Sequence, residues 1–141
     1  EAWRVMGLQQ VEIVMLGYNT PSLNMDNRGF EAHHLRVEHS HLSIRAGCYQ
    51  NACFGVATAK GGTEDGHELF GHSIIVNPQG EIMAQATSWG DELITADCDL
   101  DDCKLGRSTI FNFAAHRRPE AYGRITEQVG SVEPPIWTPQ A

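Results

Sequence analysis

The sequence lacks long apolar runs and has little positive charge. Its longest apolar stretches, around residues 13–16 and 73–76, are far shorter than the about 20 residues that a membrane-crossing helix needs. Eighteen acidic residues against ten basic ones give a formal net charge of −8. A broad surface that neutralises phosphates is therefore missing. We expect no membrane span and no nucleic-acid partner.

A secretory leader is also missing, because no basic segment followed by an apolar stretch opens the sequence. We therefore expect a reducing, cytoplasmic setting. The length of 141 residues, with 41% hydrophobic and 20% charged residues, is typical of one globular domain. Collagen-like, low-complexity and intrinsically disordered classes are excluded by this composition.

The sequence has no closely spaced cysteine pair of the kind that structural zinc sites use. Its four cysteines form two pairs with four residues between the partners: Cys48, Cys53, Cys98 and Cys103. Cys48 ends a helical pattern and Cys53 opens a strand-like run, so we expect their side chains to point in different directions. We interpret all four as small thiols of a cytosolic core.

The apolar patterning of the first half predicts an α/β layer, with roughly five strands and two to three helices in the whole chain. Residues 2–9 are typical of the end of a helix. Residues 11–16 form a strand that is apolar on both faces in its second half, as in a strand covered on both sides. After a loop over residues 17–29, a helix over residues 30–50 is expected to bury one stripe: Leu35, Leu42, Ala46 and Tyr49.

The second half predicts further strands and one short helix. Residues 53–59 suit a strand, and the glycine-rich residues 60–66 are expected to break it. Residues 73–76 and 82–86 flank the turn Asn77-Pro78-Gln79-Gly80, which indicates a hairpin. The remaining expectations are a strand over residues 93–98, a helix up to Leu105 capped by aspartates (Asp99, Asp101 and Asp102), and an extended tail over residues 126–141.

Histidines are numerous, and four of the seven lie within nine residues: His33, His34, His39 and His41. No two of them are spaced i, i+4 on the expected helix, so we interpret them as a solvated helix face or a subunit contact rather than a metal site.

Two short motifs resemble catalytic signatures but fail on geometry. Residues 67–72 hold two histidines five apart with a glycine between them, whereas a zinc-protease helix needs them four apart. The pattern that starts at Gly71 has Ile75 where a nucleophile elbow needs its closing glycine. We therefore expect Ser73 to be an ordinary strand residue.

The loop Gly17-Tyr18-Asn19-Thr20-Pro21 directly follows the first apolar strand. Ligand sites of α/β sheets form at such strand ends. The amide of Asn19 and the hydroxyl of Thr20 can orient a carboxylate or a ureido group through several hydrogen bonds. Alternatively, both side chains satisfy backbone groups in a turn before Pro21. Spacing alone leaves both interpretations open.

Several stretches resemble one known group. They are residues 1–9, VEIVMLGYNTP, AGCYQN, LFGHSIIVNPQGEI, ITADCDLD and FNFAAHRRPEAYG, which extend over nearly the whole chain to Ile125. Together they resemble the nitrilase superfamily of carbon–nitrogen hydrolases, whose hallmark is the glycine, serine, proline and glycine of GHSIIVNPQG. YNTP, FNFAAHRRP and the departure at AGCYQN from the superfamily's usual Arg-Ala and Glu-Asn are similar to the branch that hydrolyses N-carbamoyl-D-amino acids.

The resemblance implies that residues 1–125 are the C-terminal half of a four-layer αββα sandwich. It implies a Cys nucleophile, a Glu base and a Lys, all of which would precede residue 1, so no catalytic residue is assigned in this chain and the segment alone is expected to be inactive. Asn19 and Thr20 match substrate-binding positions. A small-molecule N-carbamoyl amino acid as substrate, a homo-oligomer, and no metal or organic cofactor are also implied.

Two alternatives from other classes stay open. The first is a non-catalytic interaction module that keeps the fold remnant and binds a partner through the histidine-rich helix and residues 111–119. The second is a metal-binding domain built on the histidines and cysteines.

Overall fold

A computed structural model describes residues 1–22 and 32–135. The elements in these residues are, in chain order, α1 (Ala2–Leu8), β1 (Ile13–Tyr18), α2 (His33–Asn51), β2 (Phe54–Ala59), β3 (Gly61–Glu64), β4 (His67–Phe70), β5 (Ile74–Val76), β6 (Ile82–Gln85), α3 (Asp102–Ser108), α4 (Phe113–His116), the 3-10 helix η1 (Pro119–Ala121) and α5 (Gly123–Glu127). The predicted α/β class is confirmed. The expected start of the long helix at residues 30–31 and the loop residues 23–29 lie outside the described residues.

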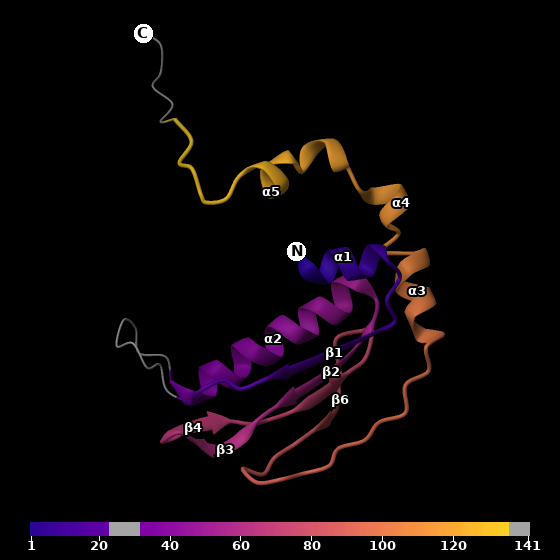
Figure 1. Ribbon diagram of the computed structural model, residues 1–141. Helices are drawn as coiled ribbons and strands as arrows, with labels where there is room; N and C mark the ends of the chain where they lie inside the picture. The colour runs from indigo at the N-terminus through magenta and orange to yellow at the C-terminus, as the bar shows by residue number, and fades with distance from the viewer. Residues whose placement is uncertain (23–31, 136–141) are drawn as a thin grey trace.

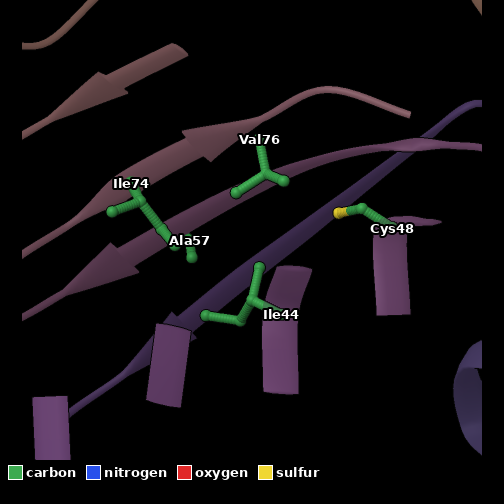
Figure 2. Close-up of a cluster of buried hydrophobic side chains, with 5 residues drawn as sticks. All are labelled: Ile44, Cys48, Ala57, Ile74 and Val76. Atoms are coloured by element: carbon green, nitrogen blue, oxygen red, sulfur yellow. The ribbon is translucent and has the colours of Figure 1, made fainter. Parts of the chain in front are cut away.

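The main sheet has the strand order β1-β2-β5-β6, and β3 and β4 form a separate hairpin. β1 runs parallel to β2, and the other neighbours are antiparallel. Helix α2 lies along one face of the sheet with α1 beside it (Figure 1). Ile44 and Cys48 of α2 point toward side chains of the sheet (Ala57, Ile74 and Val76), and together they form the core (Figure 2).

The buried face of α2 differs from the predicted stripe. Leu35, Leu42 and Tyr49 are exposed and Ala46 is only half-buried. The buried residues are instead His41, Ile44, Gly47, Cys48 and Asn51. Apart from Ile44, these buried residues are small or polar. The large apolar side chains therefore predicted the wrong face of the helix.

The expectation that the first strand is covered on both faces is wrong for this chain. Val14 is 5% exposed and packs toward α2, whereas the next residue, Met15, is 76% exposed. β1 is an edge strand of the sheet, and Met15 lies exposed on its face away from α2. A strand can be apolar on both sides in sequence and yet be covered on only one.

One hairpin was predicted and the other was missed. The hairpin of β5 and β6 is confirmed, and Gly80 closes its turn at φ +80°. The glycine-rich residues 60–66 were expected to break the chain, but Gly61–Glu64 form β3, which pairs with β4. Gly62 and Gly66 both have φ +81°, so here glycine shapes the hairpin instead of ending regular structure.

The expected strand over residues 93–98 is wrong, because these residues have no strand partner and Leu93 is 88% exposed. Helix α3 is confirmed but extends to Ser108. Its N-cap residue Asp101 makes no side-chain capping hydrogen bond, and the Asp99 carboxylate instead accepts a hydrogen bond from the Asp101 N–H at 3.0 Å. Downstream of α3 the chain passes α1 (Figure 1). Cζ of Arg4 in α1 lies 4.1 Å from the ring centroid of Phe113.

The predicted tail begins inside a helix, because α5 ends at Glu127. Residues 128–135 follow without helix or strand, and residues 136–141 lie outside the described residues. The boundary between the hydrolase domain and the tail, expected between residues 125 and 126, stays a prediction. No helix within residues 1–22 and 32–135 is long and apolar enough to cross a membrane.

Candidate functional site

A pocket of about 500 Å³ lies at the carboxyl ends of β1 and β2. Because the two strands are parallel, both chains leave the sheet at the same edge, which is where α/β proteins place their ligand sites. Residues from both strand ends and from β3 line the pocket: Gly17, Tyr18, Asn19, Thr58, Lys60 and Glu64. The structure thus places the predicted Asn19 in the wall of a pocket, and Thr20 follows it half-buried.

Backbone hydrogen bonds fix the loop that carries Asn19 and Thr20. The Phe70 N–H donates to the Thr20 carbonyl at 3.1 Å, and the Ser22 N–H donates to the Glu68 carbonyl at 2.7 Å. Pro21 forms an isolated bridge with Leu69 between these two bonds. The loop is therefore attached to β4 like a short additional strand, which limits the positions open to Asn19.

The polar side chains of the pocket form one connected group. Glu64 is ion-paired with Lys60, and it lines the pocket together with Asn19. Hydrogen bonds from Lys60 and from Asn19 hold the pKa of the Glu64 carboxyl below its usual value.

Tyr18 forms the apolar side of this pocket. Its ring packs against Phe70, with ring centroids 5.9 Å apart, and its hydroxyl accepts a hydrogen bond from Ser40 of α2 at 3.3 Å. Burial raises the pKa of the Tyr18 hydroxyl, so at neutral pH this side chain is an uncharged wall. α2, β1 and β4 thus meet at Tyr18, directly before the loop.

The expectation that Cys48 and Cys53 point apart is wrong. Helix α2 ends in a Schellman motif, with Ala52 at φ +47° and the Cys53 N–H donating to the Cys48 carbonyl at 3.2 Å. This motif brings Cys48, in the last turn of α2, close to Cys53, the residue after Ala52. The two thiols consequently share a hydrogen bond.

None of the four cysteines lines the Asn19 pocket. The hydrogen bond with Cys53 and burial raise the pKa of Cys48, and burial raises the pKa of Cys98 and of Cys103. The same thiol hydrogen bond lowers the pKa of Cys53, but this residue is 1% exposed. These thiols serve as packing groups in the structure.

The four helix histidines separate in space. His34 and His39 are exposed, whereas His41 is 5% exposed and its Nε2 lies 2.9 Å from the His72 carbonyl oxygen. The prediction of a solvated face is thus wrong for His41. His33 stacks on Trp89 with centroids 5.3 Å apart. Within the described part of the chain, no three His, Cys, Asp or Glu residues are arranged to hold a metal ion.

Ser73 serves the backbone. Its hydroxyl accepts a hydrogen bond from the Ala59 N–H at 3.0 Å and lies 3.3 Å from the Ala59 carbonyl. It therefore ties the end of β2 to the start of β5, next to the pocket. A second cavity of about 290 Å³ shares Thr58 and Lys60 with the first, and a larger one of about 790 Å³ lies between α1, α3 and α4, at the other end of β1.

Comparisons with known proteins identify the family. The model of the carbon-nitrogen hydrolase family matches residues 1–108. The chain belongs to this family. It is similar to the human deaminated glutathione amidase, with 33% identity over 90 residues, and to the nitrilase and fragile histidine triad fusion protein of Drosophila melanogaster, with 31% identity over 97 residues.

The fold also matches that of a solved relative. The crystal structure of a carbon-nitrogen hydrolase from Helicobacter pylori G27 superimposes with a TM-score of 0.74 at 25% sequence identity, covering 90% of this chain and 45% of the relative. The matched regions cover 62% and 68% of this chain but only 26% of the human and 21% of the Drosophila protein. The chain thus has the fold of part of a nitrilase-type hydrolase and spans less than half of these relatives.

Of the two residues predicted from the sequence, Asn19 lines the pocket and Thr20 does not, and their role in substrate binding stays a prediction. Sequence reasoning missed Lys60 and Glu64, which also line the pocket. The available signal was the position of Lys60, which directly follows the carboxyl end of a predicted strand. Glu64 could not be found in this way, because it reaches the pocket only through the β3–β4 hairpin, which the glycine-rich sequence concealed.

Proposed function

We propose that this chain is the substrate-facing part of an amidohydrolase that converts an N-carbamoyl-D-amino acid to the D-amino acid, ammonia and carbon dioxide. The observation that carries the proposal is the position of Asn19 in the pocket where β1 and β2 end. YNTP and FNFAAHRRP, which resemble the carbamoylase branch, supply the substrate class. Hydrolysis of this small-molecule substrate is expected to need no metal or organic cofactor.

The chemistry follows from the family to which the chain belongs. A Cys thiolate attacks the carbamoyl carbon and expels ammonia, which leaves a thioester acyl-enzyme. Water then attacks this thioester, frees the thiol and releases the N-carboxy amino acid, which loses carbon dioxide to give the D-amino acid. A Glu acts as general base, and a Lys stabilises the oxyanion as it develops. We propose that these three residues lie outside residues 1–141, since none of the cysteines present here lines the pocket.

The pocket wall suits a ureido group. Such a group carries one carbonyl acceptor and several N–H donors, and an asparagine amide offers the complementary acceptor and donors. Attachment of the loop to β4 holds this amide in place before substrate arrives, which reduces the entropy lost on binding. The apolar ring of Tyr18 lines one side of the same pocket.

The test is steady-state release of ammonia by the full-length gene product, with Asn19→Ala as the variant. We expect kcat/KM for N-carbamoyl-D-amino acids to fall by about ten- to a hundredfold, because the substrate's ureido group would lose its hydrogen bonds to the amide, a loss of roughly 1–3 kcal/mol. Gln79→Ala, an exposed amide in the β5–β6 turn, serves as the matched control and should behave as wild type.

Two results would contradict the proposal. An unchanged kcat/KM for Asn19→Ala would make Asn19 a turn former. Ammonia release from other amides but not from N-carbamoyl-D-amino acids would keep the family chemistry and reject the substrate. A non-catalytic module predicts no turnover of either class by the full-length protein.

A further inference from the structure

The cavity of about 790 Å³ lies at the amino end of β1, where α1, α3 and α4 meet (Figure 1). Its volume is in the range that is typical of small-molecule sites. Part of its lining is apolar and includes two rings: Leu8, Phe111, Phe113 and Pro119. The proposed hydrolysis uses none of these residues, so the cavity is not explained by that reaction.

Two arginines that line this cavity carry positive charges without a carboxylate partner. Arg107 of α3 donates from Nη1 and Nη2 to the carbonyl oxygens of Gln10 and Val11, at 3.3 and 2.7 Å. Cζ of Arg117 lies 5.4 Å from the ring centroid of Tyr122. Within residues 1–22 and 32–135, neither arginine forms an ion pair. Carbonyl groups and a ring therefore orient the two guanidinium groups and leave their charges uncompensated.

Positive charge predominates at this cavity although the whole chain has a formal net charge of −8. Lys104 also lines the cavity, but it forms an ion pair with Asp101 at 2.6 Å. Arg4 lies over the ring of Phe113, which belongs to the cavity wall. Among the described residues of the lining, Glu12 is the only one with a carboxylate. An acidic protein thus concentrates several of its few cations around one cavity.

Arg107 also has a donor without an acceptor. Its Nε is buried and forms no hydrogen bond within the described part of the chain. Buried polar groups of native proteins are nearly always hydrogen-bonded, so an exception of this kind calls for a partner that the site receives. A guanidinium group forms its strongest hydrogen bonds with carboxylate and phosphate oxygens, often two in parallel. The chemistry of the lining therefore favours an anion.

We propose that this cavity binds a small organic anion, whose carboxylate or phosphate group binds Arg107 and Arg117 and whose apolar body packs against Leu8 and Phe111. The charges agree with this ligand class. The two arginines and Glu12 leave one positive charge, or two with Arg4, and a singly or doubly charged head group neutralises them. The proposal does not depend on which substrate the hydrolase cleaves.

Isothermal titration calorimetry of the full-length gene product tests the site, with phenyl phosphate and benzoate as probes. We expect saturable binding of at least one probe, and the tighter of the two identifies the preferred head group. Inorganic phosphate lacks the apolar body and benzyl alcohol lacks the charge, so both should bind at least about tenfold more weakly. Asn19→Ala, which alters the other pocket, should leave binding of the tighter probe unchanged.

A pair of neighbouring variants locates the binding. Arg117→Met should weaken binding of the tighter probe by about tenfold or more, because it removes a charged donor. Arg118→Met removes the same charge from an exposed position outside the cavity lining, so it is the matched control and should bind like wild type. Thermal unfolding without probe checks that both variants are folded.

Three results would overturn the proposal. The first is the absence of saturable binding of either probe up to about 10 mM. The second is an equal loss of affinity in Arg117→Met and Arg118→Met, or binding of inorganic phosphate as tight as that of phenyl phosphate. The third is a change of oligomeric state in Arg117→Met, measured by sedimentation velocity, without probe binding to the wild type. The cations would then hold an acidic surface of a second copy.

Discussion

At the scale of single residues, close backbone approaches decide which side chains the core accepts. A Cβ placed on Gly47 in the middle of α2 would lie 2.4 Å from Cε2 of Trp3. Similarly, a Cβ on Gly7 of α1 would lie 2.7 Å from Oδ1 of Asn51. The two helices therefore meet through glycines, each of which faces a larger side chain of the other helix.

Gly47→Ala should lower the free energy of unfolding. In an open helix this substitution adds about 1 kcal/mol of stability, but here the methyl group would overlap the Trp3 ring, and overpacking costs about 1–3 kcal/mol. Chemical denaturation measures the difference. Trp3→Leu should relieve part of the loss in the Gly47→Ala background. A stabilising Gly47→Ala would show that the two helices do not pack as described.

His72 couples stability to pH. Burial, followed by the charges of His41 and His33, lowers the pKa of His72 from its ordinary value of 6.5. The unfolded chain then binds a proton more readily than the folded one, so stability falls as the pH drops below about 6.5 toward the depressed value. We expect a lower free energy of unfolding at pH 5.5 than at pH 7.5.

His72→Asn should flatten this dependence. Asparagine tolerates the left-handed backbone of position 72, where φ is 59°, and it does not titrate. His34→Asn, an exposed position on α2, is the control and should keep the wild-type slope. Equal slopes for all three proteins would remove His72 from the account of acid sensitivity.

At the scale of elements, helix α1 ends in a strained cap. The Val11 N–H donates to the Met6 carbonyl and the Gln10 N–H to the Gly7 carbonyl, which form a Schellman motif with Gln10 at φ 61°. A left-handed conformation costs a non-glycine residue about 1–2 kcal/mol. Gln10→Gly should therefore raise the free energy of unfolding by about 1 kcal/mol.

The neighbouring residue provides a matched control for this prediction. Gln9 has φ −84°, so Gln9→Gly only adds flexibility to the unfolded chain and should lower stability. Both variants are compared by denaturant unfolding. If the two glycine variants change stability in the same direction, the cap is not the source of the strain.

Local signals predicted some elements and failed for others. The Asn77–Gly80 turn encodes its own dihedral angles, so the β5–β6 hairpin was found, and the rule that ligands bind at strand ends located Asn19. The buried face of α2 was missed because Gly47, Cys48 and Asn51 pack there, and these residues have no large apolar side chain. Glu64 was missed because it reaches the pocket only through the β3–β4 hairpin, and the glycine-rich sequence of that hairpin did not predict strands.

At the scale of the whole molecule, the sheet face opposite α2 is exposed at its β1 edge but not at Ile75 of β5, which is 7% exposed. The register places Met15, Val56, Ile75 and Ala84 in one row across the four strands, on the side opposite α2. Met15 is 76% exposed. Ile110 and Ile125, in the segment after α3, are also exposed, at 64% and 56%. Apolar surface of this kind is typical of contacts with further protein. The homo-oligomer expected from the sequence resemblance stays a proposal.

The exposed apolar face and the missing nucleophile have a common explanation. The chain spans 45% of the Helicobacter pylori relative, and the Asn19 pocket is formed without any cysteine. We propose that further polypeptide both covers the open face and brings the reactive thiol to the pocket. On this account the 141 residues alone are inactive.

The most direct test is to locate the reactive sulfur. The full-length gene product is inactivated with a thiol-reactive analogue of an N-carbamoyl-D-amino acid, and the labelled cysteine is identified by peptide mapping. We predict a single labelled cysteine outside residues 1–141, with protection by the natural substrate. Substrate-protected labelling of Cys48, Cys53, Cys98 or Cys103, accompanied by loss of activity, would contradict the account.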